Sequence, residues 1–285
     1  MNSMTIVRIS RFVITSVLIC VPQFGCTNSA IGNAQQEKAQ SAARIFDKLC
    51  GTAGEKIFKT VENVDGVFLV KLRPEKSHDS QQFSLDDPYG RDFSGHAYIK
   101  SFLAGFSESG TSGGAGARPV GYKFVEAIDP ADMRMYRYTA SLKAVRKKDI
   151  TAPYVKAEIV KNPKYDINIY AFVLDKKSVE SRSARFGVQY NDISTQEQRE
   201  HWIAGSLLQI IDLDSNAVLA ERTGYMMDPG QGATAGGRSP WLIAAGYACP
   251  GFGLNGQRSY GVPGAAGEQM QQSELFAEKV VKPTR

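Results

Sequence analysis

Apolar residues with a period of two dominate the middle of the chain and predict a series of strands. The clearest stretch is 135–143 (MYRYTASLK), where Tyr136 and Tyr138 share one face and Arg137 and Lys143 share the other. Such alternation is typical of a sheet with one buried and one solvated face. Similar composition, rich in β-branched and aromatic residues, predicts strands at 67–72, 121–128, 165–174, 184–190, 206–213 and 217–226.

Helical patterns lie closer to the two ends. Residues 35–49 place Ala42, Ile45, Phe46 and Leu49 at helical spacing. Shorter helices are predicted at 98–106, after Pro240 as far as Cys249, and at 273–281. A helix, a run of strands and then further helices indicate an α+β fold. We therefore expect a single domain over residues 35–285, built on an antiparallel β-sheet meander with an N-terminal helix and C-terminal helices.

Two glycine-rich stretches interrupt this pattern. Residues 107–118 (SESGTSGGAGAR) are small and polar, which predicts a flexible exposed loop. Residues 228–267 are rich in Gly and Pro, which predicts irregular structure around the helix that follows Pro240.

The N-terminus has the features of an export signal. Arg8 and Arg11 precede the apolar run FVITSVLICV, which is too short to span a bilayer, so residues 1–25 are interpreted as a signal peptide. Gly25-Cys26 resembles the end of a lipoprotein signal, in which Cys26 would be acylated and residues 26–34 would form a tether. Ordinary cleavage after Ala34 is the alternative. The protein is expected to be a periplasm-facing lipoprotein, anchored to a membrane through Cys26, or a soluble periplasmic protein.

The cysteines favour one disulfide. Cys20 lies within the signal peptide, and acylation of Cys26 would leave Cys50 and Cys249 as a pair in an oxidising compartment. The chain has no CxxC and no Cys/His cluster, so no metal and no cofactor are expected. We predict a Cys50–Cys249 disulfide that closes a loop of about 200 residues.

Charge is unevenly distributed. The 285 residues carry 34 Lys and Arg against 29 Asp and Glu, a net charge of +5. Residues 134–164 alone hold nine basic and two acidic residues, including Arg146, Lys147 and Lys148. One interpretation is a solvated sheet face and loop; the other is a docking surface for an acidic protein, anionic lipid or an anionic envelope polymer. Nucleic acid is not expected as a partner of an exported chain without a binding motif.

The densest set of catalytically useful groups is the segment from Asp86 to His96. Asp87, Asp92 and His96 are weak candidates for a general base or a cation site. Their spacing matches no EF-hand, and a Pro-Tyr-Gly turn with Asx hydrogen bonds explains the segment equally. Residues 110–114 (GTSGG) match the nucleophile elbow of serine hydrolases in letters only, because they lie in a Gly/Ser-rich loop.

Aromatic and arginine side chains suggest where a partner would bind. Tyr136, Arg137, Arg238 and Trp241 are candidates for an interface, since such residues anchor protein contacts. For Trp241, burial near the disulfide is the alternative.

Several phrases of the sequence resemble a known group of proteins. DDPYGRD, YIKSFL, NDIST, GYMMDPGQG and GGRSPW look like those of uncharacterised exported, lipoprotein-like proteins of Gram-negative bacteria, over most of the chain after Cys50. The resemblance implies export and one compact domain. It implies no activity and transfers no catalytic residue.

Together these features favour a non-enzymatic protein-binding module of the cell envelope over an enzyme. The most specific version is an immunity protein against an envelope-acting antibacterial toxin. The alternatives are an envelope hydrolase that uses the Asp86–His96 segment, and a structural lipoprotein that binds an anionic envelope polymer.

Overall fold

The computed structural model describes residues 27–75, 81–83, 87–89, 93–104, 121–252 and 269–284, with side chains described from residue 35 onward. The chain divides into two compact units, Met1–Glu37 and Lys38–Arg285. The predicted signal peptide, Cys26 and the glycine-rich loop 107–118 lie outside the described residues. Helix α1 (Thr27–Cys50) begins eight residues before the predicted helix and ends at Cys50, the cysteine predicted to form the disulfide.

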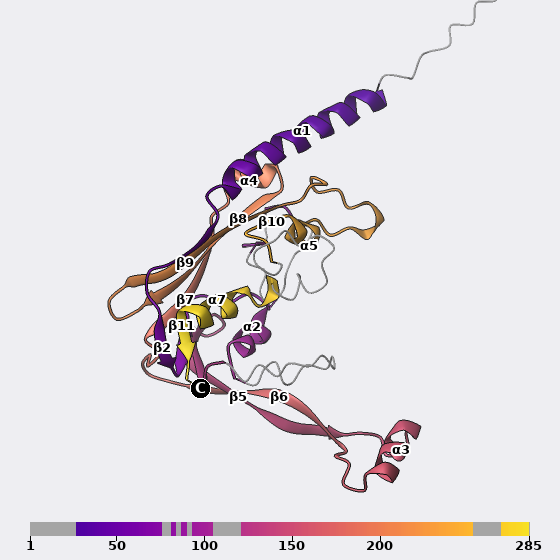
Figure 1. Ribbon diagram of the computed structural model, residues 1–285, viewed down its shortest axis with the longest axis vertical. Coiled ribbons are helices and arrows are strands. Elements are labelled where there is room, and N and C mark those ends of the chain that lie inside the picture. The colour runs from indigo at the N-terminus through magenta and orange to yellow at the C-terminus, as the bar shows by residue number, and fades with distance from the viewer. Residues whose placement is uncertain are drawn as a thin grey trace, which may run out of the picture. The chain divides into compact units, whose positions relative to one another are not determined.

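A nine-stranded sheet organises the described part of the second unit, in the order β1-β9-β8-β7-β3-β4-β5-β6 with β10 added beside β9 (Figure 1). Its strands are β1 (Gly54–Ile57), β3 (Gly66–Leu69), β4 (Phe124–Asp129), β5 (Arg134–Lys147), β6 (Asn168–Ser178), β7 (Phe186–Asp192), β8 (Ile203–Asp212), β9 (Ala217–Met227) and β10 (Ala248–Cys249). A separate parallel pair joins β2 (Val61–Val64) to β11 (Val281–Pro283).

The sheet consists of two antiparallel meanders with one strand between them. β4-β5-β6 and β7-β8-β9 each run up and down, and β3 pairs in parallel with both β4 and β7. All four residues of β3 are buried, as expected for a central strand covered on both faces. The prediction of an α+β fold with an antiparallel meander is confirmed. The parallel pairing of the central strand β3 was not predicted.

Short helices lie between the strands along the chain. They are α2 (Gly95–Ser101), α3 (Pro153–Lys161), α4 (Gln196–Glu200), α5 (Pro240–Ala244) and α7 (Gln272–Val280), with 3₁₀ turns η2 (Ala235–Gly237) and η3 (Ala245–Tyr247). Phe102, directly after α2, and Phe276 from α7 join strand residues such as Val125 and Val188 in the main hydrophobic core. Burial of these apolar side chains holds the helices on the sheet.

The segment after Pro240 differs from its prediction. The helix ends at Ala244, and after η3 the chain becomes the short strand β10, where Ala248 and Cys249 pair with Met226 and Tyr225 of β9. Gly246 disfavours a continuous helix, and the strand pairing satisfies the backbone that a helix would have used.

The predicted disulfide is present. The sulfur atoms of Cys50 and Cys249 are 2.01 Å apart, across a sequence separation of 199 residues. The bond ties the end of α1 to β10. In the chain-entropy model, closing a loop of this length stabilises the fold by about 5 kcal/mol, less any native strain.

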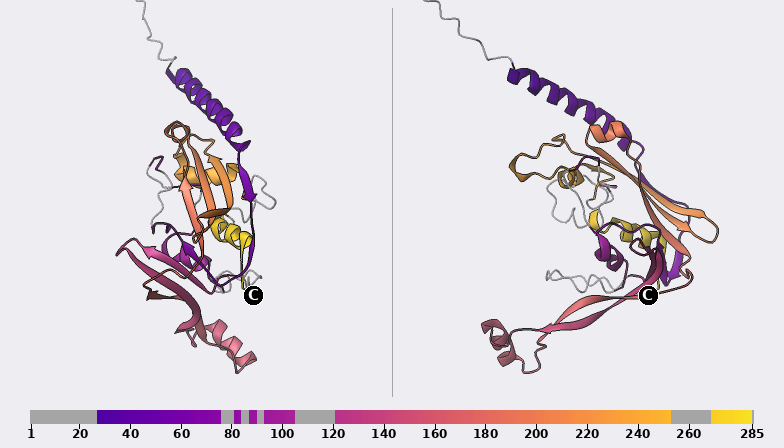
Figure 2. Two further views of the ribbon diagram at one scale, coloured as in Figure 1. Left: turned by 90° about the vertical axis from the view of Figure 1, so that its left-hand side faces the viewer. Right: turned by 180° about the vertical axis from the view of Figure 1, so that it is seen from behind.

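One hairpin continues past the rest of the sheet. β4 pairs with β5 only as far as Tyr138, whereas β5 and β6 stay paired from Ala140 with Leu174 to Lys147 with Asn168. We call residues 140–174 the arm; it is a two-stranded ribbon whose strands are joined by a connection that contains α3. Figures 1 and 2 show the ribbon leaving the sheet with α3 at its far end.

Candidate functional site

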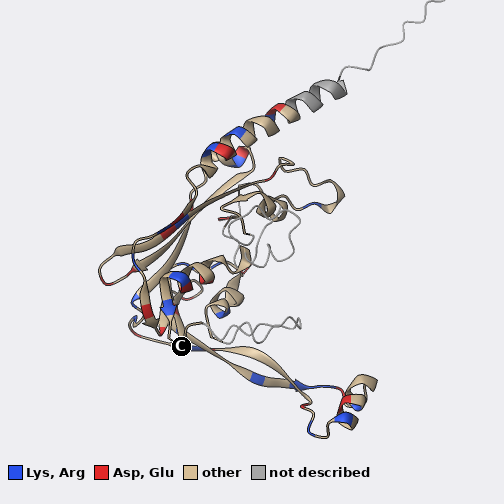
Figure 3. Ribbon diagram, viewed as in Figure 1, with Lys and Arg blue, Asp and Glu red and all other residues tan. Residues whose placement is uncertain are grey.

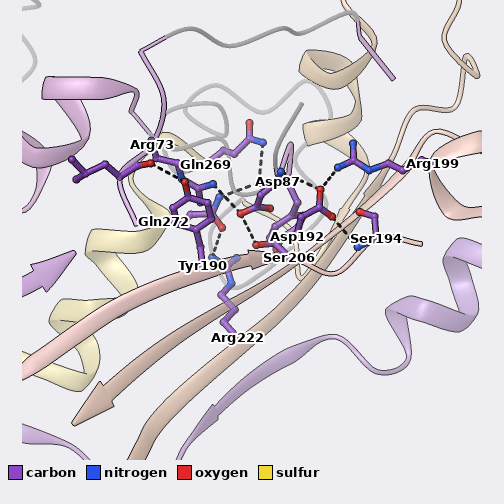
Figure 4. A network of polar contacts seen from close by, with 12 residues as sticks. Arg73, Asp87, Tyr190, Asp192, Ser194, Arg199, Ser206, Arg222, Gln269 and Gln272 are labelled. Atoms are coloured by element: carbon purple, nitrogen blue, oxygen red, sulfur yellow. Dashed lines mark hydrogen bonds and ion pairs between the residues drawn. The ribbon is translucent and has the colours of Figure 1, made fainter. Parts of the chain in front are cut away.

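Asp87, one of the three catalytic candidates, lies inside the protein. Its side chain is fully buried and forms an ion pair with the buried Arg73, with 2.9 Å between Nη1 and Oδ2. Ser206 of β8 donates a hydrogen bond to the same oxygen at 3.0 Å (Figure 4). A buried carboxylate with an arginine and a hydroxyl donor is electrostatically satisfied.

A second acidic residue extends this arrangement. The Asp87 backbone N–H donates to Asp192 at 3.1 Å, and Asp192 in turn accepts from the Ser194 backbone N–H at 2.8 Å and pairs with the buried Arg199. The Arg73 guanidinium lies 3.3 Å from the ring centroid of Tyr190. We call Arg73, Asp87, Asp192, Arg199 and Ser206 the Asp87 network. It holds the chain near residues 73 and 87 against β7, β8 and α4.

His96 is exposed near the start of α2, directly after Gly95, whose backbone N–H donates to the Arg73 carbonyl at 3.2 Å. Asp129, at the end of β4, is another carboxylate with an internal partner. The pKa of Asp129 is below its ordinary value mainly because Lys176 donates a hydrogen bond to the carboxylate, with a further contribution from the Ala131 backbone N–H. Asp86, Asp92 and the neighbouring Arg91 lie outside the described residues. The hydrolase hypothesis therefore stays a prediction, with Asp87 buried in an ion pair and His96 exposed on a helix.

Arg238 and Trp241, two of the interface candidates, are engaged within the protein. Arg238 pairs with the fully buried Asp228. Asp228 also accepts from the backbone N–H groups of Gly230 and Gly232 at 3.0 and 2.7 Å, so the glycine-rich turn is organised around this carboxylate. Trp241 is fully buried and donates from Nε1 to the Gln81 carbonyl at 3.0 Å. The structure therefore shows Trp241 buried inside the protein, which was the alternative to an exposed interface position.

Tyr136 and Arg137 also have internal partners. Arg137 donates to Glu126 from two nitrogens, at 3.0 and 2.8 Å, and Tyr136 donates to Asp132 at 2.6 Å. Because the two side chains are neighbours on β5, they point to opposite faces of the sheet. The four aromatic and arginine candidates thus do not form one surface.

The remaining basic candidates lie on the arm. Lys148 donates to the Tyr165 hydroxyl at 2.9 Å and to the Asp166 carbonyl at 3.0 Å, which helps to hold the ends of the connection together. Arg146 and Lys147 are exposed, and neither has an ion-pair partner among the described residues. In Figure 3 the blue segments mark Lys and Arg positions along the ribbon and around α3.

The arm also exposes apolar side chains. Val160, Tyr154 and Ile150 are 82%, 65% and 56% exposed. Further exposed large apolar residues on the ribbon are Leu142, Val145 and Tyr170. A two-stranded ribbon has little interior in which to bury such groups. Because a cluster of exposed apolar side chains with polar neighbours is typical of an interaction site, the arm is the best candidate functional surface.

The sequence analysis missed α3 and the ion-paired aspartates. One signal could have located these aspartates: Asp87, Asp129 and Asp228 each directly precede a proline, and each is ion-paired in the structure. Asp87 and Asp228 are buried, and Asp129 is partly exposed. Restriction of the residue before proline and the tendency of Asp to accept a nearby backbone N–H make such pairs strong turn formers.

No family model, curated protein sequence or solved structure matches this chain. Within the described residues, no group of three or more His, Cys, Asp or Glu side chains is arranged to hold a metal ion. None of the helices there is long and apolar enough to cross a membrane.

Proposed function

We propose that the protein is an exported, non-enzymatic binding module of the bacterial cell envelope, and that it contacts a negatively charged partner through its arm. The observation that carries this proposal is the arm itself. Within residues 140–174 the sequence has seven Lys and Arg against three Asp and Glu, together with the exposed apolar side chains of the ribbon and α3.

The internal pairing on the arm leaves most of this positive charge uncompensated. Lys143 pairs with Asp175 and Lys161 with Glu158, both at exposed positions where such pairs are weak. Four basic residues of the arm, Arg146, Lys147, Lys156 and Lys164, have neither an ion-pair partner nor a side-chain hydrogen bond among the described residues, whereas Lys148 is held by its hydrogen bonds to Tyr165 and Asp166. We call these four residues the free basic set. Their combined field would attract an anionic surface and accelerate its encounter with the arm.

Association with isolated envelopes tests the proposal. The full chain is made with Cys26→Ser, which removes any lipid anchor, and its cosedimentation with envelopes of its host is measured at low and high salt. We expect binding that weakens with salt and that is lost when the free basic set is changed to Gln. The matched control replaces four exposed basic residues outside the arm, Arg44, Lys48, Lys59 and Lys177, with Gln.

Equal binding of the two quadruple variants would show that the arm is not the contact surface. A protein partner, including a toxin as in the immunity hypothesis, would be identified by photo-crosslinking from position 160, with position 58 as the exposed control site.

A further inference from the structure

The outer side of α3 carries an apolar stripe. Val155 is fully buried and so defines the inner side of the helix. With 3.6 residues per turn, Pro153, Ala157 and Val160 lie along the opposite side, and all three are exposed. The helix therefore presents apolar side chains outward at the end of the arm, where the described residues provide nothing to cover them.

Two lysines border this stripe. Lys156 lies along one side of it and Lys161 along the other. The exposed Tyr154 is on the same side of the helix as Lys161, two turns closer to the start of α3. A helix that lies in the headgroup region of a bilayer has this arrangement, because its apolar face enters the acyl boundary while lysine side chains extend sideways to the phosphates. Tyrosine is enriched at the same depth.

The type of basic residue separates a lipid surface from an acidic protein. Six of the seven basic residues on the arm are Lys, and the exception is Arg146. Lysine is depleted from protein interfaces, where Arg and aromatic side chains anchor the contact. Clusters of Lys beside an apolar face are instead typical of binding to anionic lipid headgroups, which need charge but no fixed geometry.

We propose that the anionic partner of the arm is a lipid bilayer surface, on which the outer side of α3 lies with basic side chains of the free basic set against the headgroups. The inference rests on the proposed function and specifies its partner. Each basic side chain close to an anionic surface raises the partition coefficient roughly fivefold. Because Arg146 and Lys147 are consecutive on β5 and point to opposite faces of the ribbon, about three of the four residues can act together, and they contribute on the order of a hundredfold. Because α3 has only nine residues, its apolar contribution is small and binding is reversible.

Flotation with protein-free vesicles tests the inference. The full chain with Cys26→Ser is mixed with vesicles of phosphatidylcholine alone or of phosphatidylcholine with phosphatidylglycerol. We expect flotation only with the anionic vesicles, reduced on the order of a hundredfold by the Gln variant of the free basic set and unchanged in the control variant of Arg44, Lys48, Lys59 and Lys177. Val160→Asp should reduce binding about tenfold, since it places a negative charge in the stripe.

A fluorescent reporter checks the contact directly. In the Tyr154→Trp variant the new indole is expected to shift to shorter wavelength on anionic vesicles and to be quenched by brominated lipid. Flotation insensitive to Val160→Asp, or an unshifted indole, would overturn the placement of α3 on the bilayer.

The outcomes separate the two proposals. Binding to native envelopes that depends on the free basic set, without binding to anionic vesicles, would overturn the lipid inference while keeping the proposed function, with an acidic protein or polymer as partner. Loss of both would overturn both. Arm-dependent dimers in sedimentation without vesicles would also contradict the inference, because they would identify a second copy as the partner of the arm.

Discussion

The Asp87 network and the arm use charged residues in opposite ways. In the network, Arg73 and Asp87 are buried and paired, and Asp192 and Arg199 pair beside them. On the arm, the four residues of the free basic set are exposed and have no ion-pair partner in the described part of the chain. Removing charges from water is costly unless they are paired, so the network is explained by the fold that it holds together. The fold gives no such account of the charge on the arm, and the anionic partner that we propose would supply one.

Replacement of Asp87 should produce the largest effect. Asp87→Ala leaves the buried Arg73 guanidinium without its counter-ion and should lower the free energy of unfolding by about 3 to 5 kcal/mol. Chemical denaturation measures this change. The exposed Asp175, which pairs with Lys143, provides the control: Asp175→Ala should cost less than about 1 kcal/mol. Unchanged stability together with loss of a hydrolytic activity would reverse the comparison and support the Asp86–His96 hypothesis.

The glycine-rich turn offers an intermediate case. Asp228→Ala removes the acceptor of two backbone N–H groups and the partner of Arg238, which is partly exposed. We expect a loss of about 2 kcal/mol, less than for Asp87, because Arg238 can be solvated once its partner is gone. Thermal unfolding measures the loss, and faster hydrogen exchange at the Gly230 and Gly232 amides should accompany it. A loss as large as that of Asp87→Ala would show that solvation of the unpaired arginine does not determine how much stability is lost.

Titration of Asp212 provides a smaller test. Arg185 donates to its carboxylate at 2.6 Å, which lowers the pKa of Asp212 to about 2. A lowered pKa in the folded state stabilises the protein above the unfolded value of about 3.9, and this stabilisation is lost as the pH falls toward about 2. The stability difference between the wild type and Asp212→Asn should therefore be constant above about pH 5 and disappear near pH 2. A difference that persists at pH 2 would show that the ionic form is not its source.

Local patterns in the sequence predicted the longer strands of the sheet. Alternation located β5, in which Tyr138 is buried and residues 141–147 are exposed. Composition located β7, β8 and β9 to within a few residues, because each of these three strands buries one or both faces. The cysteine parity predicted the disulfide. The strand predictions rest on burial, which shapes the pattern of each segment locally. The disulfide prediction rests on the oxidising compartment and on the number of cysteines, so neither prediction requires knowledge of how the chain folds.

Long-range partnerships could not be predicted. Asp87 meets Asp192 and Ser206 across more than 100 residues of sequence, and no local pattern records which distant side chain will face a buried carboxylate. The position of β3, which pairs in parallel with both β4 and β7, could not be predicted for the same reason, because it depends on segments that are far apart in the sequence. Helix α3 was missed because its charged and apolar residues look like a solvated loop, and only Pro153, at the first helical position, indicates its start.

The smallest effect on stability is expected on the arm, and it completes the comparison. Changing the free basic set to Gln should alter the free energy of unfolding by less than about 0.5 kcal/mol per site, because exposed residues without partners contribute little to the fold. On helix α3, Val155 and Val160 form a matched pair: Val155→Asp buries a charge and should melt the helix, whereas Val160→Asp should leave it intact. Circular dichroism and denaturation measure both effects. If the free basic set instead costs several kcal/mol, the arm is a structural element like the Asp87 network, and its charge would no longer call for a partner.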